Sequence, residues 1–266
     1  MSQTNEYIPS FHKILSITAE TALENTYRLA FDGAAKPGQF FEVSIPKFGE
    51  IPISISEIGD GYLDMTIRKV GHVTGELFTF VAGDSFLMRG PYGQGFDIEH
   101  FKGKEVVVAA GGTGVSPVKP VIDYFAKNSA EAKALHVLVG FKSRADILFK
   151  DAIEGWKSTA TSVALTLDNA EEGHTGPVGF IPALVPSVAL NNPETAQVVV
   201  VGPPVMINTT ANAFIARGVK PENIWISMER RMACGIGKCG HCKIDDKYVC
   251  LDGPVFRYDQ GIKLVD

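Results

Sequence analysis

Cysteine is missing from the first 233 residues of this 266-residue chain, and all four cysteines lie between positions 234 and 250. Long apolar runs are missing too. Stretches such as EVVVAA (105–110) and QVVVVG (197–202) are far shorter than the ~20 residues that a membrane helix needs. Nor is positive charge in excess, since 25 Lys and Arg stand against 30 Asp and Glu. These absences argue against a disulfide framework, a transmembrane helix and a nucleic-acid-binding surface.

The composition is that of an ordinary globular protein, with 45% hydrophobic and 21% charged residues and no internal repeat. A chain of this length predicts two domains with a small appendage. The polar start MSQTNEYIPS (1–10) lacks the order of a signal peptide, so we expect a cytoplasmic location. Structural disulfides are rare there, and four clustered cysteines therefore predict a metal site.

From about residue 8 to residue 100 the sequence predicts short β-strands separated by turns, with Gly59-Asp60-Gly61 as the strongest turn signal. The strand candidates are KILSITAE (13–20), TYRLAFDG (26–33), GQFFEVSIP (38–46), IPISISE (51–57) and YLDMTIR (62–68). Strands at this spacing, with no convincing helix between them, predict a small antiparallel barrel.

After about residue 101, strands alternate with helices. KEVVVAAGGTGVSPVKPVIDYFAKN (104–128) predicts a buried strand, a glycine turn and an amphipathic helix. Further strands are expected at 134–141, 161–168 and 196–203, and a helix at 205–219. This alternation predicts a doubly wound parallel sheet. The expected fold class is thus β plus α/β, with domains at 1–100, 101–226 and 227–266, the last one carrying the cysteines.

The cysteine spacing is C-x4-C-x2-C-x7-C, and its opening is the arrangement of plant-type [2Fe–2S] ferredoxins. Such a cluster needs four thiolates, and small residues between them let backbone N–H groups approach the sulfur atoms. Glycines fill this role at 235, 237 and 240. The predicted metal ligands are Cys234, Cys239, Cys242 and Cys250.

Structural zinc is the alternative metal, although zinc sites usually show two C-x2-C pairs and this chain has one. His241 could replace a ligand, but with four cysteines available we expect it to face solvent.

Three further motifs suggest phosphate or nucleotide binding. Gly111-Gly112-Thr113-Gly114 follows a strand and precedes a helix, an arrangement that brings a pyrophosphate to a helix N-terminus. Residues 66–74 (TIRKVGHVT) offer a cation and a possible short helix start, and Gly202-Pro203-Pro204 ends a strand at the sheet edge where ligands bind. Each has a purely structural alternative: a tight strand–helix turn, barrel strands with a helix cap, or a plain strand exit.

In this order the motifs resemble those of ferredoxin–NADP reductase-like flavoproteins, and the resemblance covers essentially the whole chain. Its elements are PGQF (37–40), IPISIS (51–56), IRKVGHVT (67–74), GPYGQGF (90–96), AAGGTG (109–114), VGPPVM (201–206) and the cysteines. Within that superfamily the cysteine-bearing end is similar to electron-transfer subunits of dihydroorotate dehydrogenase B, some hydrogenases and anaerobic sulfite reductase. The similarity to the sulfite reductase subunits is the strongest, through ERRMACGIGKCGHC (229–242) in particular.

The resemblance implies FAD between barrel and sheet, NADH or NADPH facing its ring, and a [2Fe–2S] cluster in the last segment. Carried over by position, the flavin contacts are Pro52, Ile53 and Ser54. The ribityl and phosphate contacts are Thr66, Ile67, Arg68, Gly71, Val73 and Thr74. The nicotinamide nucleotide contacts are Gly111, Gly112, Thr113, Gly114, Gly202, Pro203 and Pro204.

The chain departs from the superfamily at Ile51, where most members have an arginine that binds the flavin phosphate. Either Arg68 replaces that charge or FAD binds less tightly. Lys142, Ser143 and Arg144 follow a strand where a 2′-phosphate could be read, or they form an ordinary solvated loop, so the sequence does not choose between NADH and NADPH.

The implied function is that of an oxidoreductase subunit that moves electrons from NAD(P)H through FAD and the cluster to a partner, with no general acid or base. The partner that the resemblance implies is the set of sirohaem and iron–sulfur subunits of an anaerobic sulfite reductase. One cluster would use all four cysteines and leave no ligands for a sirohaem here, so we expect the chain alone to be inert toward sulfite. Dihydroorotate dehydrogenase B or a hydrogenase is the alternative partner. A redox sensor without turnover is an alternative of another class.

Overall fold

The computed structural model describes residues 7–264, so the first six residues of the polar start lie outside it. Contacts divide this part of the chain into two compact units. The first contains residues 7–95 and 228–254, and the second contains residues 96–227 and 255–264. The three domains predicted from the sequence stay a prediction. The units show that residues 228–254 pack with the N-terminal part and residues 255–264 with the middle of the chain.

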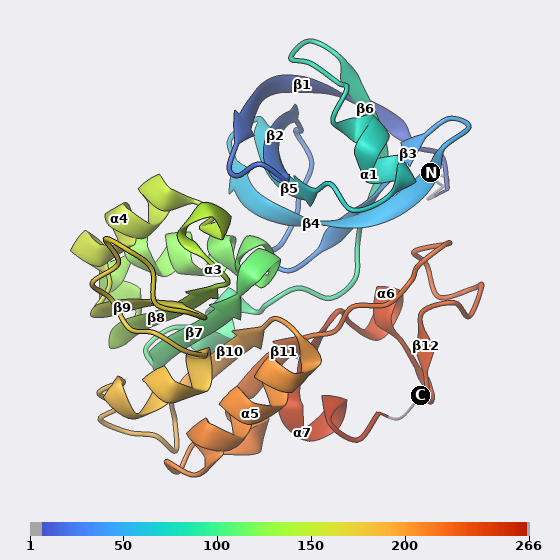
Figure 1. The fold of residues 1–266 in the computed structure, drawn as a ribbon. Helices are drawn as coiled ribbons and strands as arrows, with labels where there is room; N and C mark the ends of the chain where they lie inside the picture. The colour runs from blue at the N-terminus through green and yellow to red at the C-terminus, as the bar shows by residue number, and fades with distance from the viewer. Residues whose placement is uncertain (1–6, 265–266) are drawn as a thin grey trace. The chain divides into compact units, whose positions relative to one another are not determined.

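The first unit is built on a closed six-stranded antiparallel barrel in the order β1-β2-β5-β4-β3-β6 (Figure 1), as the sequence predicts. Its strands are β1 (Ser10–Ala19), β2 (Glu24–Ala30), β3 (Phe40–Ile45), β4 (Gly49–Gly59), β5 (Tyr62–Arg68) and β6 (Ser85–Tyr92). Alternate residues fill the interior, such as Phe41, Val43 and Ile45 on β3. The short helix α1 (His72–Leu77) adds Leu77 to this core.

The second unit is a six-stranded sheet in the order β14-β11-β10-β7-β8-β9. Its strands are β7 (Glu105–Gly111), β8 (Ala134–Phe141), β9 (Ser162–Leu167), β10 (Gln197–Val201), β11 (Ile224–Ser227) and β14 (Val255–Arg257). All pairs are parallel except β11 with β14. The central strands are buried on both faces, which explains their unbroken apolar sequences.

Helices cover both faces of this sheet. In Figure 1, α3 (Val115–Lys127) and α4 (Lys150–Thr159) lie on one side and α5 (Pro204–Ile215) on the other. The helix α2 (Ile98–Phe101) precedes β7. None of the helices in the described part of the chain is long and apolar enough to cross a membrane.

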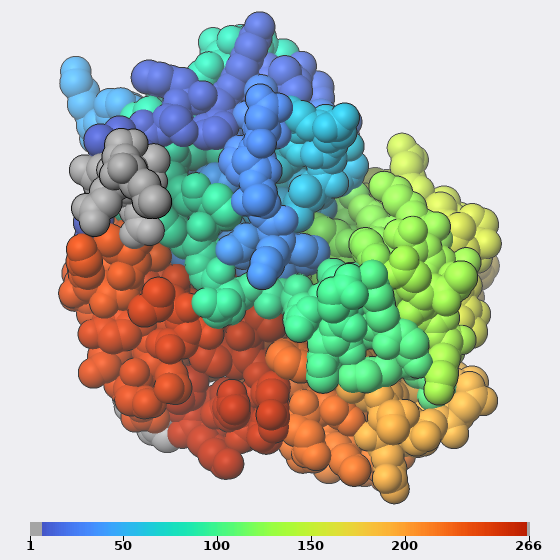
Figure 2. Space-filling view, turned by 180° about the vertical axis from the view of Figure 1, so that it is seen from behind, coloured from blue at the N-terminus to red at the C-terminus, as the bar shows by residue number. Residues whose placement is uncertain are grey.

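The C-terminal region contains little regular structure. It has a two-stranded ribbon, β12 (Lys243–Ile244) with β13 (Lys247–Tyr248), and the short helices α6 (Val249–Asp252) and α7 (Tyr258–Gly261). We call residues 228–254 the cysteine segment. It packs in the same unit as the barrel, and Figure 2 shows its orange-red surface beside the barrel. The backbone N–H of Gln94 donates a hydrogen bond of 2.5 Å to the Gly253 carbonyl, and Gln94 forms an isolated β-bridge with Pro254.

On the outer side of the barrel, one acidic residue is fully buried, although acidic residues usually face solvent. Glu42 on β3 is 0% exposed, and neither of its carboxylate oxygens has a hydrogen-bond partner among the described residues. Burial raises the pKa of Glu42 to about 7, and the nearby Glu50 and Cys234 act in the same direction, whereas Arg89 opposes them. Above that pH the folded protein therefore holds an unpaired buried charge.

We expect Glu42→Gln to change how stability depends on pH. Because the folded pKa of about 7 lies above the ordinary 4.5, the native state holds more protons between these values. The wild-type free energy of unfolding should therefore fall as pH rises through this interval, by on the order of 3 kcal/mol. The variant should lack this fall, so its advantage over wild type should grow with pH. Thermal unfolding between pH 4.5 and 8 measures it, with the exposed Glu222→Gln as control. A pH-independent difference would contradict the assignment.

The turn between β7 and α3 requires glycine for a steric reason. A Cβ atom on Gly114 would lie 2.6 Å from the carbonyl oxygen of Val201 on β10. We expect Gly114→Ala to lower the free energy of unfolding by about 1–3 kcal/mol, because backbone cannot move aside easily. Gly155→Ala, at an exposed position of α4, is the control, since its Cβ would meet nothing within 4 Å. This control substitution should raise the free energy of unfolding by roughly 0.5–1 kcal/mol. Chemical denaturation separates the two, and equal effects would contradict this account.

Candidate functional site

All four cysteines lie in the cysteine segment, and none of them forms a disulfide. Cys234, Cys242 and Cys250 are buried, whereas Cys239 is exposed. The Sγ atoms of Cys242 and Cys250 are 3.2 Å apart. Two thiolates bound at ~2.3 Å to one tetrahedral metal would be about 3.8 Å apart, so these two sulfurs are close to the spacing of a shared metal atom.

Backbone N–H groups point at the sulfur atoms. The amides of Ile236, Lys238 and Cys239 approach Cys234 Sγ at 3.5, 3.3 and 3.4 Å. The amide of Gly237 approaches Cys250 Sγ at 3.1 Å, and the Cys250 amide approaches Cys242 Sγ at 3.5 Å. Amide dipoles directed at sulfur stabilise thiolates, which are the form that binds metal. This donor set fits an iron–sulfur cluster.

The glycines between the cysteines make this loop possible. Gly235, Gly237 and Gly240 have φ values of 74°, 71° and 83°, a region that other residues rarely adopt. The loop also lies close to its surroundings, since a Cβ on Gly235 would be 2.7 Å from the Tyr92 ring. Both requirements agree with the role that the sequence analysis gave these glycines.

The thiols differ in acidity. A backbone hydrogen bond from His241 lowers the pKa of Cys239. Burial, together with the Cys242 thiol, raises the pKa of Cys250 to about 12.

The His241 side chain is exposed, as expected. In the described part of the chain, no three His, Cys, Asp or Glu side chains form a preassembled single-ion site. The identity of the four ligands and the cluster type stay predictions.

Sequence reasoning missed Arg89, which joins the barrel to the cysteine segment. Arg89 lies on β6, is 6% exposed and is ion-paired with Glu50 on β4. Its Nη1 and Nη2 groups donate to the carbonyl oxygens of Cys234 and Ala233. No local sequence pattern indicates this role of Arg89, because its partners are 39 to 145 positions away in the chain.

The predicted flavin contacts Pro52, Ile53 and Ser54 lie on β4, and all three are half-buried. Ile53 packs partly against the barrel core, and so does Ile51, which stands where most of the superfamily has arginine. Glu50 is on the same strand, two residues before Pro52.

The predicted phosphate contacts on β5 already have partners within the barrel. Arg68 forms a 3.0 Å ion pair with Glu24, and the Thr66 hydroxyl donates to Ser56 at 3.0 Å. The Ile67 side chain is fully buried in the core, so only its backbone could reach a ligand. Arg68 would have to leave or share Glu24 to replace the missing arginine.

The turn before α1 is held by Thr74. Its hydroxyl accepts from the amides of Val70 and Gly71 at 3.0 and 2.8 Å and donates to the Gly71 carbonyl. Val73 packs partly against the barrel core. The helix start expected after Gly71 is therefore present. The phosphate contact predicted for the Thr74 hydroxyl stays a prediction, because that hydroxyl caps its own turn here.

The two glycine motifs of the second unit lie side by side. β7 and β10 are adjacent parallel strands, so their carboxyl ends reach the same edge of the sheet. A Cβ atom on Gly111 or on Gly202 would lie 2.6 or 2.9 Å from the same Met206 Sδ atom. Thr113, Pro203 and Pro204 are exposed there. The fold thus brings both predicted nucleotide motifs together at the position where open α/β sheets bind ligands.

The loop after β8 is partly occupied by internal bonds. Ser143 donates to Asp146 at 2.5 Å, and Arg144 donates through Nη1 to the Glu172 carbonyl at 2.9 Å. Lys142 is exposed.

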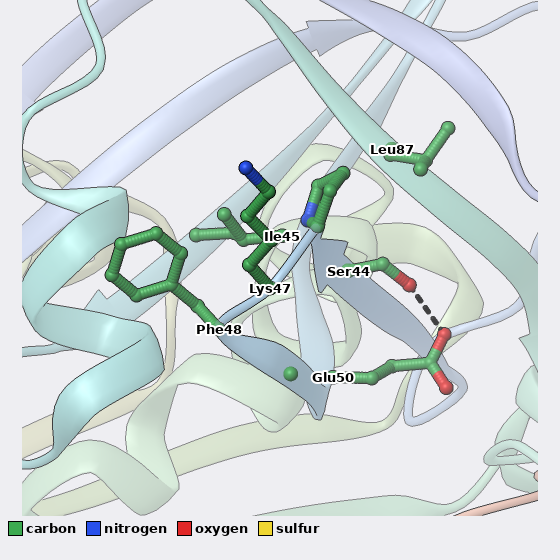
Figure 3. Close-up of a pocket in the computed structure, with 8 residues that line it drawn as sticks. Ser44, Ile45, Lys47, Phe48, Glu50 and Leu87 are labelled. Carbon is green, nitrogen blue, oxygen red and sulfur yellow. Dashed lines mark hydrogen bonds between the residues drawn. The ribbon is translucent and has the colours of Figure 1, made fainter.

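An open hollow lies at the β3–β4 hairpin and is lined by Lys47 and Phe48 (Figure 3). In the same hairpin, the Ser44 hydroxyl donates a hydrogen bond to the Glu50 carboxylate. None of the cofactor residues predicted from the sequence lines the hollow, and it does not mark the site.

Comparison with known proteins covers both units. Residues 108–212 match the family described as "Oxidoreductase NAD-binding domain". Residues 229–261, which include all four cysteines, match "Iron-sulfur cluster binding domain of dihydroorotate dehydrogenase B".

Two curated relatives span nearly the whole chain. The chain is 35% identical to sulfhydrogenase 1 subunit gamma of Pyrococcus furiosus, over 97% of its own length and 94% of the relative's. It is 32% identical to a probable dihydroorotate dehydrogenase B (NAD(+)) electron transfer subunit of Thermoplasma volcanium, over 94% and 90%.

The fold is shared with a solved NADH-dependent reduced ferredoxin-NADP oxidoreductase from work on electron bifurcation. The TM-score is 0.74 at 24% identity, with 94% of this chain and 89% of that chain covered. The named relatives are hydrogenase and dihydroorotate dehydrogenase subunits, so they favour the two alternative partners over the sulfite reductase expected first. The chain belongs to the family of ferredoxin reductase-like, NAD-binding electron-transfer subunits with a C-terminal iron–sulfur binding domain.

Proposed function

We propose that this chain takes electrons from NADH or NADPH through FAD to a [2Fe–2S] cluster bound by its four cysteines, and passes them to a catalytic partner subunit. When bound, the flavin accepts a hydride and the cluster accepts single electrons. The chain itself binds, orients and shields these groups, and no acid or base of its own is needed.

The observation that carries the proposal is the convergence of backbone amides on the cysteine sulfurs, within the same unit as the barrel. A neutral thiol or a disulfide sulfur accepts hydrogen bonds only weakly, whereas a metal-bound thiolate is stabilised by several amide dipoles. A cluster also needs its surroundings fixed in advance, and the left-handed glycines of this loop meet that need.

The cofactor contacts follow from this assignment. We assign the flavin ring to Pro52, Ile53 and Ser54, and its phosphates to the backbone and side chains of residues 66–68 and 71–74. Residues 111–114 and 202–204 take the nicotinamide nucleotide, which is supported by their adjacency at one sheet edge.

For the partner, we propose a catalytic subunit of the kind that hydrogenase gamma subunits or dihydroorotate dehydrogenase electron-transfer subunits serve. The near full-length similarity to both supports this choice. The sulfite reductase partner inferred from the cysteine motif is the remaining candidate, and the experiment that follows distinguishes all three.

The partner can be identified by purifying the complex from its native source, identifying its subunits and assaying it. We expect the isolated chain to reduce ferricyanide with NADH or NADPH and to be inert toward hydrogen, dihydroorotate and sulfite. The complex should link the nicotinamide nucleotide to hydrogen or to dihydroorotate. Sulfite reduction by a sirohaem-containing complex would overturn the partner proposal but leave the electron-transfer role intact.

Replacing Cys239 by Ser should remove the cluster and leave FAD bound and reducible by NADH. Cys239 is the exposed cysteine at the outer turn, so its loss should disturb the barrel little. Iron, sulfide and flavin content, with visible and EPR spectra, measure the outcome. Loss of flavin together with iron would show that the cysteine segment is integral to the barrel.

His241→Ala is the matched control for that variant. His241 is also exposed, and the hydrogen bond that it donates to Cys239 comes from its backbone and survives the substitution. It should keep the cluster. Iron loss in both variants would point to general damage of the loop rather than loss of a ligand.

A further inference from the structure

Every N–H group of the Arg89 guanidinium has an acceptor. Nε and Nη2 donate to the two carboxylate oxygens of Glu50, at 2.8 and 2.5 Å. Nη2 also donates to the Ala233 carbonyl at 2.7 Å, and Nη1 donates to the Cys234 carbonyl and to the Tyr92 hydroxyl. A guanidinium has five N–H donors, and this one uses all of them while it is 6% exposed.

Two of these bonds fix the start of the cysteine loop (residues 234–242). Ala233 and Cys234 immediately precede the amides that wrap around Cys234 Sγ. Holding both carbonyl oxygens determines the direction in which the chain enters this wrap. Gly235 then lies against the Tyr92 ring, where a Cβ atom would be only 2.7 Å away. The barrel therefore sets the orientation of the first cysteine through Arg89.

Glu50 holds Arg89 in turn. Its carboxylate also accepts from Ser44 on β3 at 2.5 Å (Figure 3), so Glu50 on β4 is hydrogen-bonded to both β3 and β6. Burial alone would raise the pKa of Glu50, but the hydrogen bonds from Arg89 and Ser44 outweigh it and hold that pKa below its ordinary value. The pair thus places one buried positive and one negative charge beside the backbone of Cys234.

We propose that Arg89 is a positioning residue that orients the Cys234 end of the cluster and, with Glu50, tunes the cluster's reduction potential. This inference rests on the proposed function. Adding an electron to a cluster makes it more negative, so a nearby buried cation favours the reduced form and a nearby anion disfavours it. Removing the cation should therefore lower the potential, and removing the anion should raise it.

The test is a redox titration of the cluster in the full-length, flavin-loaded protein, followed by EPR. Arg89→Met should lower the cluster potential, and Glu50→Gln should raise it. Each shift should be at least tenfold in the oxidised–reduced equilibrium, which is about 59 mV for one electron. Arg89→Lys keeps the charge but not the fork of donors, so it should alter the EPR line shape with a smaller change in potential.

The matched control is a second arginine–carboxylate pair in the same barrel. Arg28 binds Asp64 with two bonds of 2.8 Å, and its other partners, Glu57 and Tyr62, also belong to the barrel. Arg28→Met and Asp64→Asn should leave the potential and the EPR spectrum unchanged. General damage to the barrel would instead affect both pairs alike.

The outcomes separate the two levels of inference. Wild-type protein without iron and sulfide would overturn the proposed function itself. A wild-type cluster whose potential is unchanged in both variants, or shifts in the same direction in both, would overturn only the role of Arg89. If Arg89→Met does not fold, Glu50→Gln decides alone: a raised potential supports the proposal, and an unchanged or lowered one overturns it.

Discussion

The ion pair between buried Arg89 and half-buried Glu50 is the contact on which the first unit depends most. An isolated guanidinium is very unfavourable in a protein interior, so Arg89 can stay buried only while the carboxylate and the carbonyls of residues 233 and 234 are in place. The position of the cysteine loop is thereby linked to the register of β3, β4 and β6. A slip of one residue on β6 would turn Arg89 into the barrel and leave the loop without its anchor.

The second unit depends on close approach rather than on charge. Gly114 lets the start of α3 approach the end of β10, and Gly111 and Gly202 leave room for Met206. These contacts let the carboxyl ends of β7 and β10 pack closely, with the Met206 side chain against both glycines. Glycine would also give the proposed pyrophosphate access to the backbone, so packing and the proposed binding favour the same residue type at these positions.

Much of this architecture could be predicted from the sequence, because the signals were local. β8 coincides with the predicted strand at 134–141, since a strand buried on both faces leaves an unbroken apolar run. The cysteine spacing and its glycines likewise predicted a loop that wraps sulfur. β6 was missed because Gly90 and Pro91 interrupt its strand pattern, and β14 because it has three residues.

What could not be predicted depends on distant partners. Glu42 reads as an outward residue of an alternating strand, and only the fold shows that it is fully buried. Arg89 reads as a solvent-facing cation, whereas its acceptors lie on another strand and in the C-terminal segment. The sequence also gave no reason to expect that residues 228–254 pack with the barrel while residues 255–264 return to the sheet.

The location of Glu50 connects these observations to the proposed electron route. Glu50 and the proposed flavin contacts Pro52 to Ser54 belong to one strand, and a continuous hydrogen-bonded ladder keeps that strand in register with β3. Whatever holds Pro52 in place therefore also holds Glu50, and Glu50 holds Arg89 and the first cysteine. Electron transfer is favoured when the donor and acceptor sites need little rearrangement as charge moves. The cysteine loop, whose sulfurs already face fixed amide dipoles and whose entry is anchored to the strand of the proposed flavin contacts, meets that condition in the folded chain itself.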